Sequence, residues 1–308
     1  MGENEVSVRA KILRELIADV TNNNLIGIKF RNGELRKKLV EPPYKYADEF
    51  DVELIDMKDF TMEFLKRKDS TSDKVILQLH GGGYVGAMRN AYRTFSGLYS
   101  EVGKGISVLT VDYRVAPEHP YPAALEDAIT AYKYLLMSGY SDDQIIVAGD
   151  SAGGGLAMVL AMYLRDHNEG KPLGLVCMSP WTDLTASGPS YDDNYEIDPL
   201  FGNTRESLIY DSSYIGDSDP KDPYISPLFG DFDNLPPMLI QVGSYEMLLS
   251  DSVSAAAKAK DAGVKVRLSV YEGMFHVFQM GMHILPESKK AWAEVGKFIE
   301  IMGGSCRL

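Results

Sequence analysis

Short apolar segments separated by helical stretches are the feature that most constrains the fold of this chain. Helical stretches lie near residues 122–137, 154–167 and 250–261, and a last one at 287–302. The segments between them are continuously apolar, which is typical of parallel strands buried on both faces. The alternation therefore predicts an α/β protein whose parallel sheet is covered by helices on both faces. The six predicted strands are Val75–His80, Ser107–Tyr113, Ile145–Gly149, Leu173–Ser179, Met238–Gly243 and Val266–Tyr271.

The chain before residue 75 follows different periodicities. Residues 51–66 alternate between apolar and polar side chains, which predicts a β-hairpin. Residues 5–22 carry apolar side chains at helical spacing. Two antiparallel strands added to six parallel ones predict an eight-stranded, mostly parallel sheet.

Two stretches do not fit this alternation, the N-terminal segment and an insertion rich in Asp, Ser, Tyr and Pro. Insertions of this size at the carboxyl edge of a parallel sheet usually lie over the active site. We therefore expect a cap formed by residues 1–45 and 184–222. The catalytic core is expected to comprise residues 46–183 and 223–308.

Charge and cysteine content exclude several classes of protein. The net charge of −13 argues against nucleic-acid or anionic-membrane partners. No apolar run is long enough to span a membrane. The first residues are polar and acidic, so we expect no secretory signal peptide. The two cysteines, Cys177 and Cys306, indicate neither a disulfide scaffold nor a zinc site. We expect a cytoplasmic protein without a metal.

The pentapeptide Gly149-Asp150-Ser151-Ala152-Gly153 lies between a predicted strand and a predicted helix. A G-x-S-x-G sequence in this context is a nucleophile elbow, the sharp turn that exposes the serine in α/β-hydrolases. The small glycines allow strand and helix to approach, and the helix N-terminus favours developing negative charge. The sequence therefore predicts Ser151 as a nucleophile.

A serine nucleophile needs a histidine base, which in this class follows the serine and the acid along the chain. His167 ends the helix after the elbow, about four turns from Ser151, which is too far. His276 lies in the loop after the last predicted strand and is the favoured base. His283, seven residues later, is expected to be a surface or packing residue.

The acid is expected in the loop after the strand Met238–Gly243. Glu246 lies three residues beyond this strand, and Asp251 lies eight residues beyond it. Glu246 is the favoured acid, while Asp251 is expected to begin the next helix, where a carboxylate suits the helix dipole. Asp251 remains the alternative.

The sequence His-Gly-Gly-Gly at 80–83 directly follows a predicted strand. Successive glycines allow backbone N–H groups to approach a substrate oxygen, so Gly82, Gly83 and Ala152 are the expected oxyanion-hole donors. A phosphate-binding loop is disfavoured, because no Lys-Ser/Thr follows the glycines. His80 is expected to brace the loop, and Asp150 to brace the elbow.

Together these segments resemble the hormone-sensitive-lipase-like family of α/β-hydrolases, the bacterial family IV esterases. The resemblance implies ester hydrolysis without a cofactor and a helical cap. The family usually has aspartate where Glu246 stands, which is a departure. The similar stretches are HGGGYVGA at 80–87, YRVAPEHPYPAALEDA at 113–128, GDSAGG at 149–154, SPWTDLT at 179–185, LPPMLIQVGSYEMLLSD at 235–251 and the His276 region.

These observations predict a serine carboxylesterase that acts on small, short-chain esters. An amidase or peptidase with the same triad is the nearest alternative, and a non-catalytic ligand-binding protein is a more distant one. Tyr84, after the glycines, is expected to line the pocket. The segment Val266–Tyr271 is expected at the sheet edge, where it could form a homodimer. Cap side chains that face either the substrate or the core are Tyr191, Tyr195, Leu200 and Phe201.

Overall fold

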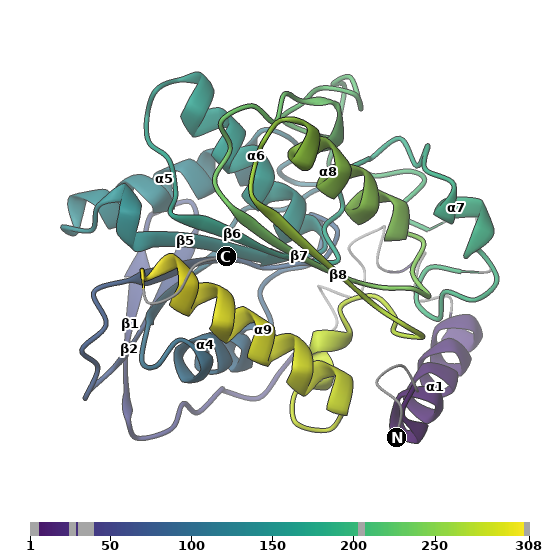
Figure 1. Ribbon diagram of the computed structural model, residues 1–308, viewed down its shortest axis with the longest axis horizontal. Helices are drawn as coiled ribbons and strands as arrows, with labels where there is room; N and C mark the ends of the chain where they lie inside the picture. Colours follow the sequence, from purple (N-terminus) through teal and green to yellow (C-terminus); the bar gives the residue numbers. More distant parts are fainter. Residues whose placement is uncertain (1–5, 25–28, 30–39, 203–206, 305–308) are drawn as a thin grey trace.

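Eight strands form one sheet in the order β1-β2-β4-β3-β5-β6-β7-β8 (Figure 1). The computed structural model describes residues 6–24, 29, 40–202 and 207–304. β2 pairs antiparallel with β1 and β4, and all other neighbours pair in parallel. The predicted eight-stranded, mostly parallel sheet is confirmed. The strands are β1 Phe50–Asp56, β2 Thr61–Arg67, β3 Val75–Leu79, β4 Ser107–Asp112, β5 Ile145–Asp150, β6 Gly174–Met178, β7 Met238–Gly243 and β8 Val266–Tyr271.

Helices cover both faces of the sheet. In Figure 1, α5, α6 and α8 lie on one face, and α4 and α9 lie on the other. In the part of the chain that the structure describes, the α-helices are α1 Val8–Asn24, α4 Asn90–Val102, α5 Ala123–Met137, α6 Ala152–Asp166, α7 Ser190–Asp193, α8 Leu249–Asp261 and α9 Pro286–Met302.

The continuously apolar strands feed two separate cores. Val75 and Leu77 of β3 pack with residues of α5, α6 and α8 in one core. Ile76, between them, packs in a second core with α4 and α9. Because successive side chains of a strand point to opposite faces, a strand between two helical layers must be apolar at every position. The central strands β3, β5, β6 and β7 are buried along their whole length.

The helix α4 was not among the helices expected from the sequence. Its buried positions include Tyr92, Phe95 and Leu98, a spacing of three residues that fits one helix face. Phe95 contacts Trp292 of α9 edge to face, with ring centroids 5.0 Å apart. This helix supplies much of the second core.

The N-terminal helix α1 lies at the β8 end of the sheet (Figure 1). Ser7 donates a hydrogen bond of 3.0 Å to Glu287, and Arg14 donates one of 3.2 Å to the carbonyl of Gly273. Within the described part of the insertion 184–222, α7 is the only α-helix, and the rest consists mainly of turns. Residues 1–5, 25–28, 30–39 and 203–206 of the expected cap lie outside the described residues.

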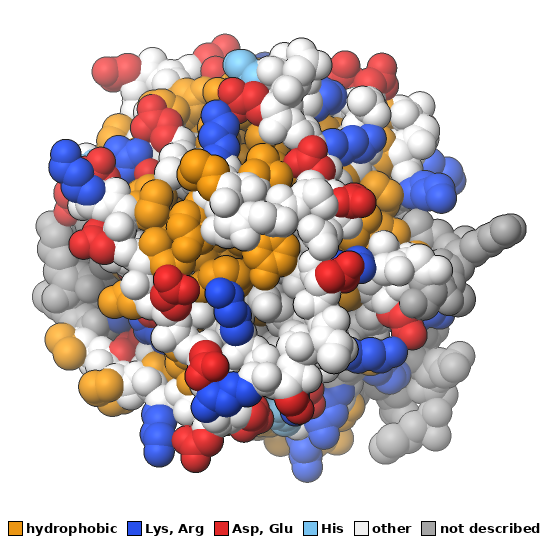
Figure 2. Space-filling view, turned by 90° about the vertical axis from the view of Figure 1, so that its left-hand side faces the viewer, with side chains coloured by type: hydrophobic (Ala, Val, Ile, Leu, Met, Phe, Trp, Pro, Cys, Tyr) orange, Lys and Arg blue, Asp and Glu red, His pale blue; other side chains and the backbone are white. Residues whose placement is uncertain are grey.

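β1 and β8 are the two edge strands of the sheet. The β1 side, which is on the left in Figure 1, carries a cluster of hydrophobic side chains surrounded by charged ones (Figure 2). Leu54 of β1 and Met137 at the end of α5 are among the exposed apolar residues. None of the described helices has the length and apolar character needed to cross a membrane.

Candidate active site

A strained turn presents Ser151 between β5 and α6. Ser151 has φ 54° and ψ −123°, a conformation that non-glycine residues rarely adopt. A Cβ atom on Gly153 would lie 2.1 Å from the carbonyl oxygen of Leu79, and one on Gly149 would lie 2.2 Å from the carbonyl oxygen of Gly153. The elbow therefore requires glycine at both positions, as its sequence indicates.

His276 lies in the loop after β8, beside the serine. Its Nε2 is 2.9 Å from Ser151 Oγ, and its Nδ1 is 2.9 Å from Glu246 Oε2. A carboxylate can only accept hydrogen bonds, so Nδ1 carries the proton and Nε2 is free to accept the serine proton. His276 is buried and Glu246 is fully buried. The structure thus brings together the three residues that the sequence pointed to.

Four other groups hold the acid loop. Oε1 of Glu246 accepts hydrogen bonds from the N–H of Gly243 and from Oγ of Ser179. The amide of Asn194, in the insertion, donates a bond of 2.7 Å to the carbonyl of Glu246. The carboxylate of Asp198 accepts a bond of 2.7 Å from the N–H of Met247. The insertion is therefore joined directly to the loop that carries the acid.

Asp251 is not part of this arrangement. It lies in the first turn of α8, as expected, but its Oδ2 accepts bonds of 2.7 and 2.8 Å from the N–H groups of Thr182 and Asp183. Burial raises the pKa of Asp251 to about 8. The alternative acid instead anchors the loop after β6.

The glycine loop after β3, the expected oxyanion hole, turns through two residues with positive φ angles. Gly82 and Gly83 have φ angles of 116° and 61°. Val85 and Gly86 donate their N–H groups to the carbonyl of Gly82, which closes the turn. Among the described residues, none accepts a hydrogen bond from the N–H of Gly82 or Gly83. These N–H groups are available to a substrate oxygen.

Asp150 connects this loop to the elbow. Its Oδ1 accepts a hydrogen bond of 3.1 Å from the N–H of Gly81. Burial raises the pKa of Asp150 to about 7, against a smaller opposing effect from His276. Asp150 braces the glycine loop as well as the turn to which it belongs.

The side chain of Tyr84 faces an aromatic cluster rather than solvent. It is buried, and its ring stacks on Tyr214 with centroids 3.8 Å apart. Tyr191, a residue of the insertion, is also buried, and its hydroxyl donates a hydrogen bond to the carbonyl of Asp183. Its side chain therefore packs on the core side of the insertion. Tyr195 and Leu200 are partly exposed.

Two insertion residues lie against the reactive groups. The ring of Phe201 is 4.9 Å from the ring of His276 between centroids. A Cβ atom on Gly83 would lie 2.6 Å from Cδ1 of Leu208. Phe201 was a candidate from the sequence, whereas Leu208, Ser179 and Asp198 were not. No local pattern marks those three, because their contacts are with residues distant in the sequence.

Three other histidines, His80, His167 and His283, have different partners. His80 is fully buried, stacks on Tyr113, and has Nδ1 2.7 Å from the carbonyl of Gly81. Burial lowers the pKa of His80, which favours the neutral ring and a bracing role. His167 stacks on Tyr163, and His283 is exposed.

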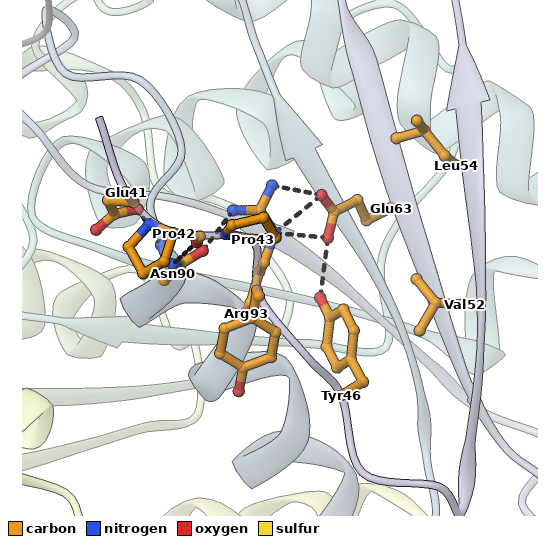
Figure 3. A pocket seen from close by; sticks show the side chains of 10 residues that line it. Glu41, Pro42, Pro43, Tyr46, Val52, Leu54, Glu63, Asn90 and Arg93 are labelled. Atoms are coloured by element: carbon orange, nitrogen blue, oxygen red, sulfur yellow. Dashed lines mark hydrogen bonds and ion pairs between the residues drawn. The ribbon is translucent and has the colours of Figure 1, made fainter. Parts of the chain in front are cut away.

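A surface hollow of about 420 Å³ lies elsewhere, near β1, β2 and α4 (Figure 3). Its polar groups bond to each other: Arg93 and Tyr46 both donate to Glu63. Within the described residues, no group of three or more metal-binding side chains is found. Cys177 is buried in β6 and burial raises its pKa to about 12, while Cys306 lies outside the described residues.

Known proteins resemble this chain in sequence and in fold. A family model described as the α/β-hydrolase fold matches residues 76–280. An esterase of Acinetobacter venetianus is 38% identical over 233 residues, which cover 75% of this chain and 76% of the relative. An acetyl-hydrolase of Streptomyces hygroscopicus is 37% identical over 231 residues, 75% and 77% of the two chains. The crystal structure of an esterase from the bacterial hormone-sensitive lipase family superposes with a TM-score of 0.83 at 34% identity, covering 97% of this chain and 99% of that one.

Proposed function

This chain belongs to the α/β-hydrolase fold family, in the branch of the hormone-sensitive-lipase-like esterases, and we propose that it is a serine carboxylesterase that hydrolyses short-chain esters through an acyl-enzyme. The observation that carries the proposal is the continuous hydrogen-bond chain from Glu246 through His276 to Ser151 at a strained elbow. The names of the relatives, esterase and acetyl-hydrolase, support an ester as the substrate.

Acylation begins when Ser151 Oγ attacks the ester carbonyl carbon while His276 Nε2 removes its proton. Glu246 stabilises the imidazolium that forms, since its carboxylate accepts the Nδ1–H bond. The carbonyl oxygen becomes an oxyanion and is bound by the N–H groups of Gly82, Gly83 and Ala152. Each such donor contributes about 3 kcal/mol to transition-state stability.

Collapse of the tetrahedral intermediate breaks the bond to the alcohol, which takes the proton from His276. The acyl group then remains on Ser151. Water attacks this acyl-enzyme, again with His276 as base, and the carboxylic acid leaves as Ser151 recovers its proton. Every proton transfer uses His276, so the mechanism needs no metal or organic cofactor.

The preference for short acyl chains rests on the cap, residues 1–45 and 184–222. Leu208 lies against Gly83, and Phe201 against His276, so the insertion limits the space beside both reactive groups. Tyr84 follows the same glycine loop, but its buried ring stacks on Tyr214 and so supports the loop from the core side rather than facing the proposed pocket. A bulky acyl group would have to displace Leu208 and Phe201.

The edge strand β8 is the proposed contact for a homodimer, because unpaired N–H and C=O groups on an edge favour strand pairing. Light scattering on the purified protein tests this directly. The buried, unpaired thiol of Cys177 fits the proposed cytoplasmic setting, where thiols stay reduced.

Hydrolysis of p-nitrophenyl esters from acetate to palmitate tests the function. Activity should peak at short chains and disappear in Ser151→Ala. A folded protein that cleaves matched anilides but no ester would instead be an amidase. A folded protein that cleaves neither would contradict the proposed chemistry.

A further inference from the structure

The two carboxylate oxygens of Glu246 have different hydrogen-bond partners, and the partners of Oε1 orient Oε2 toward His276. Oε2 bonds to His276, while Oε1 accepts a hydrogen bond of 2.8 Å from Ser179 Oγ and another from the N–H of Gly243. A glutamate side chain has three rotatable bonds, so the backbone alone does not fix its carboxylate. The partners of Oε1 must supply that restraint.

The Ser179 hydroxyl has a second contact, with the segment that carries the base. Its Oγ accepts a hydrogen bond of 3.2 Å from the N–H of Val277, the residue directly after His276. Val277 has φ 49°, an unfavourable left-handed conformation for a β-branched residue. A single hydroxyl therefore joins the acid to the backbone behind the base.

The backbone around Ser179 is itself held between the nucleophile and the acid. The N–H of Ser179 donates a bond of 2.6 Å to the carbonyl of Gln241 in β7, the strand before the acid loop. The carbonyl of the preceding Met178 accepts a bond of 2.8 Å from the N–H of Ser151. Ser179 is completely buried, so its hydroxyl has no competing contact with bulk water.

We propose that Ser179 is a positioning residue for the catalytic acid: its hydroxyl fixes the Glu246 carboxylate so that Oε2 stays directed at His276. This inference rests on the proposed triad function. Without the hydroxyl, Oε1 loses one of its two donors and the carboxylate can rotate away from Nδ1. The imidazolium is then stabilised less, although Ser179 touches neither the substrate nor Ser151 Oγ.

Ser179→Ala is the direct test, since alanine removes the hydroxyl without adding new backbone strain. We expect kcat to fall about 10- to 100-fold while KM stays within about 2-fold, because only transition-state stabilisation is lost. The acidic limb of kcat/KM should move to lower pH, because a less stabilised imidazolium releases its proton more readily. Asp150 and Asp198, whose charges also act on His276, are unchanged in this variant.

A double-mutant cycle separates positioning from general damage. In a Glu246→Ala background, Ser179→Ala should reduce kcat by less than about 2-fold, since the group that it positions is absent. An equal loss in both backgrounds would overturn the proposal. So would a Ser179→Ala enzyme with the kcat and pH profile of the wild type.

Ser226→Ala is the matched control. Ser226 is equally buried, but its hydroxyl accepts a bond of 2.8 Å from the N–H of Leu184, which is not a triad residue. It should change stability without shifting the acidic limb. Should Ser179→Ala fail to fold, Ser179→Cys, a weaker donor of similar size, is put through the same cycle with the same criteria.

The wild-type enzyme and Ser151→Ala are measured in parallel. If the wild type cleaves no ester, the proposed function fails. If it cleaves esters but the cycle shows no coupling between Ser179 and Glu246, only the positioning role fails.

Discussion

The proposed nucleophile, Ser151, and the proposed acid, Glu246, are held in place by different means. Ser151 lies in a turn that is local in sequence: β5, a strained residue and α6 follow one another directly, and Gly149 allows the strand and the helix to approach. Glu246 is fixed by distant residues, namely Ser179 after β6 and Asn194 in the insertion. A local turn motif can be recognised in a sequence, whereas a hydrogen-bonded loop depends on the whole fold.

The largest expected effect concerns the elbow that carries Ser151. Gly153→Ala would place a Cβ atom 2.1 Å from the Leu79 carbonyl oxygen and 2.5 Å from that of His80, both backbone atoms of the core. We expect the free energy of unfolding to fall by more than about 4 kcal/mol, measured by chemical denaturation.

Gly97→Ala is the control for that substitution. Gly97 lies inside α4, and a Cβ atom there would meet nothing within 4 Å. Alanine should stabilise this helix by about 0.5–1 kcal/mol. Similar losses in both variants would show that the elbow has no special packing requirement.

Asp198→Asn tests the contact between the insertion and the loop that carries Glu246. The carboxylate accepts bonds from the N–H groups of Leu200, Phe201 and Met247, so an amide NH₂ would face a donor. We expect a loss of about 3 kcal/mol in unfolding free energy and a kcat reduced about 10-fold, since Glu246 precedes Met247. The control is Asp193→Asn. Asp193 is exposed, so this substitution should change the unfolding free energy by less than about 0.5 kcal/mol. Unchanged kcat in a destabilised Asp198→Asn protein would separate the insertion from the triad.

Asp150, next to Ser151 in the elbow, should make the unfolding free energy depend on pH. Its folded pKa of about 7 is above the usual value of an aspartate, so the folded state favours the protonated acid. The stability from this group is complete at low pH and is lost as pH rises from about 4 toward 7. The unfolding free energy of the wild type, relative to Asp150→Asn, should fall by about 2 kcal/mol between pH 5 and 7. A difference that does not change with pH would place the folded pKa near its ordinary value.

The smallest expected effect concerns Leu208, the insertion residue against Gly83. Leu208→Ala should raise kcat/KM for hexanoate relative to acetate by about 10-fold, because the space beside the proposed oxyanion hole becomes larger. Separate kcat/KM measurements on the two p-nitrophenyl esters give this ratio. Val253→Ala in α8, which removes an exposed side chain, should leave the ratio unchanged. If Leu208→Ala behaves like that control, the acyl chain lies elsewhere.

Sequence reasoning succeeded where one segment carries its own signal. The apolar segments that form the strands, the elbow and the glycine loop are contiguous patterns, and the structure places Glu246 and His276 beside Ser151. The helix α4 was not predicted, although Tyr92, Phe95 and Leu98 recur at the three-residue spacing of one helix face and could have indicated it. Sequence reasoning could not find Ser179, whose partner Glu246 is 67 residues away and is chosen by the packing of β6 beside β7. Asp251 shows the same limit: its helix position was foreseen, but its bonds to the loop after β6 were not.

Labelling with a fluorophosphonate, followed by peptide mass spectrometry to locate the adduct, shows which residue is the nucleophile. The proposed triad predicts a single adduct on Ser151, absent in Ser151→Ala and formed far more slowly in His276→Ala. An active esterase that is labelled at another residue, or equally fast without His276, would contradict it.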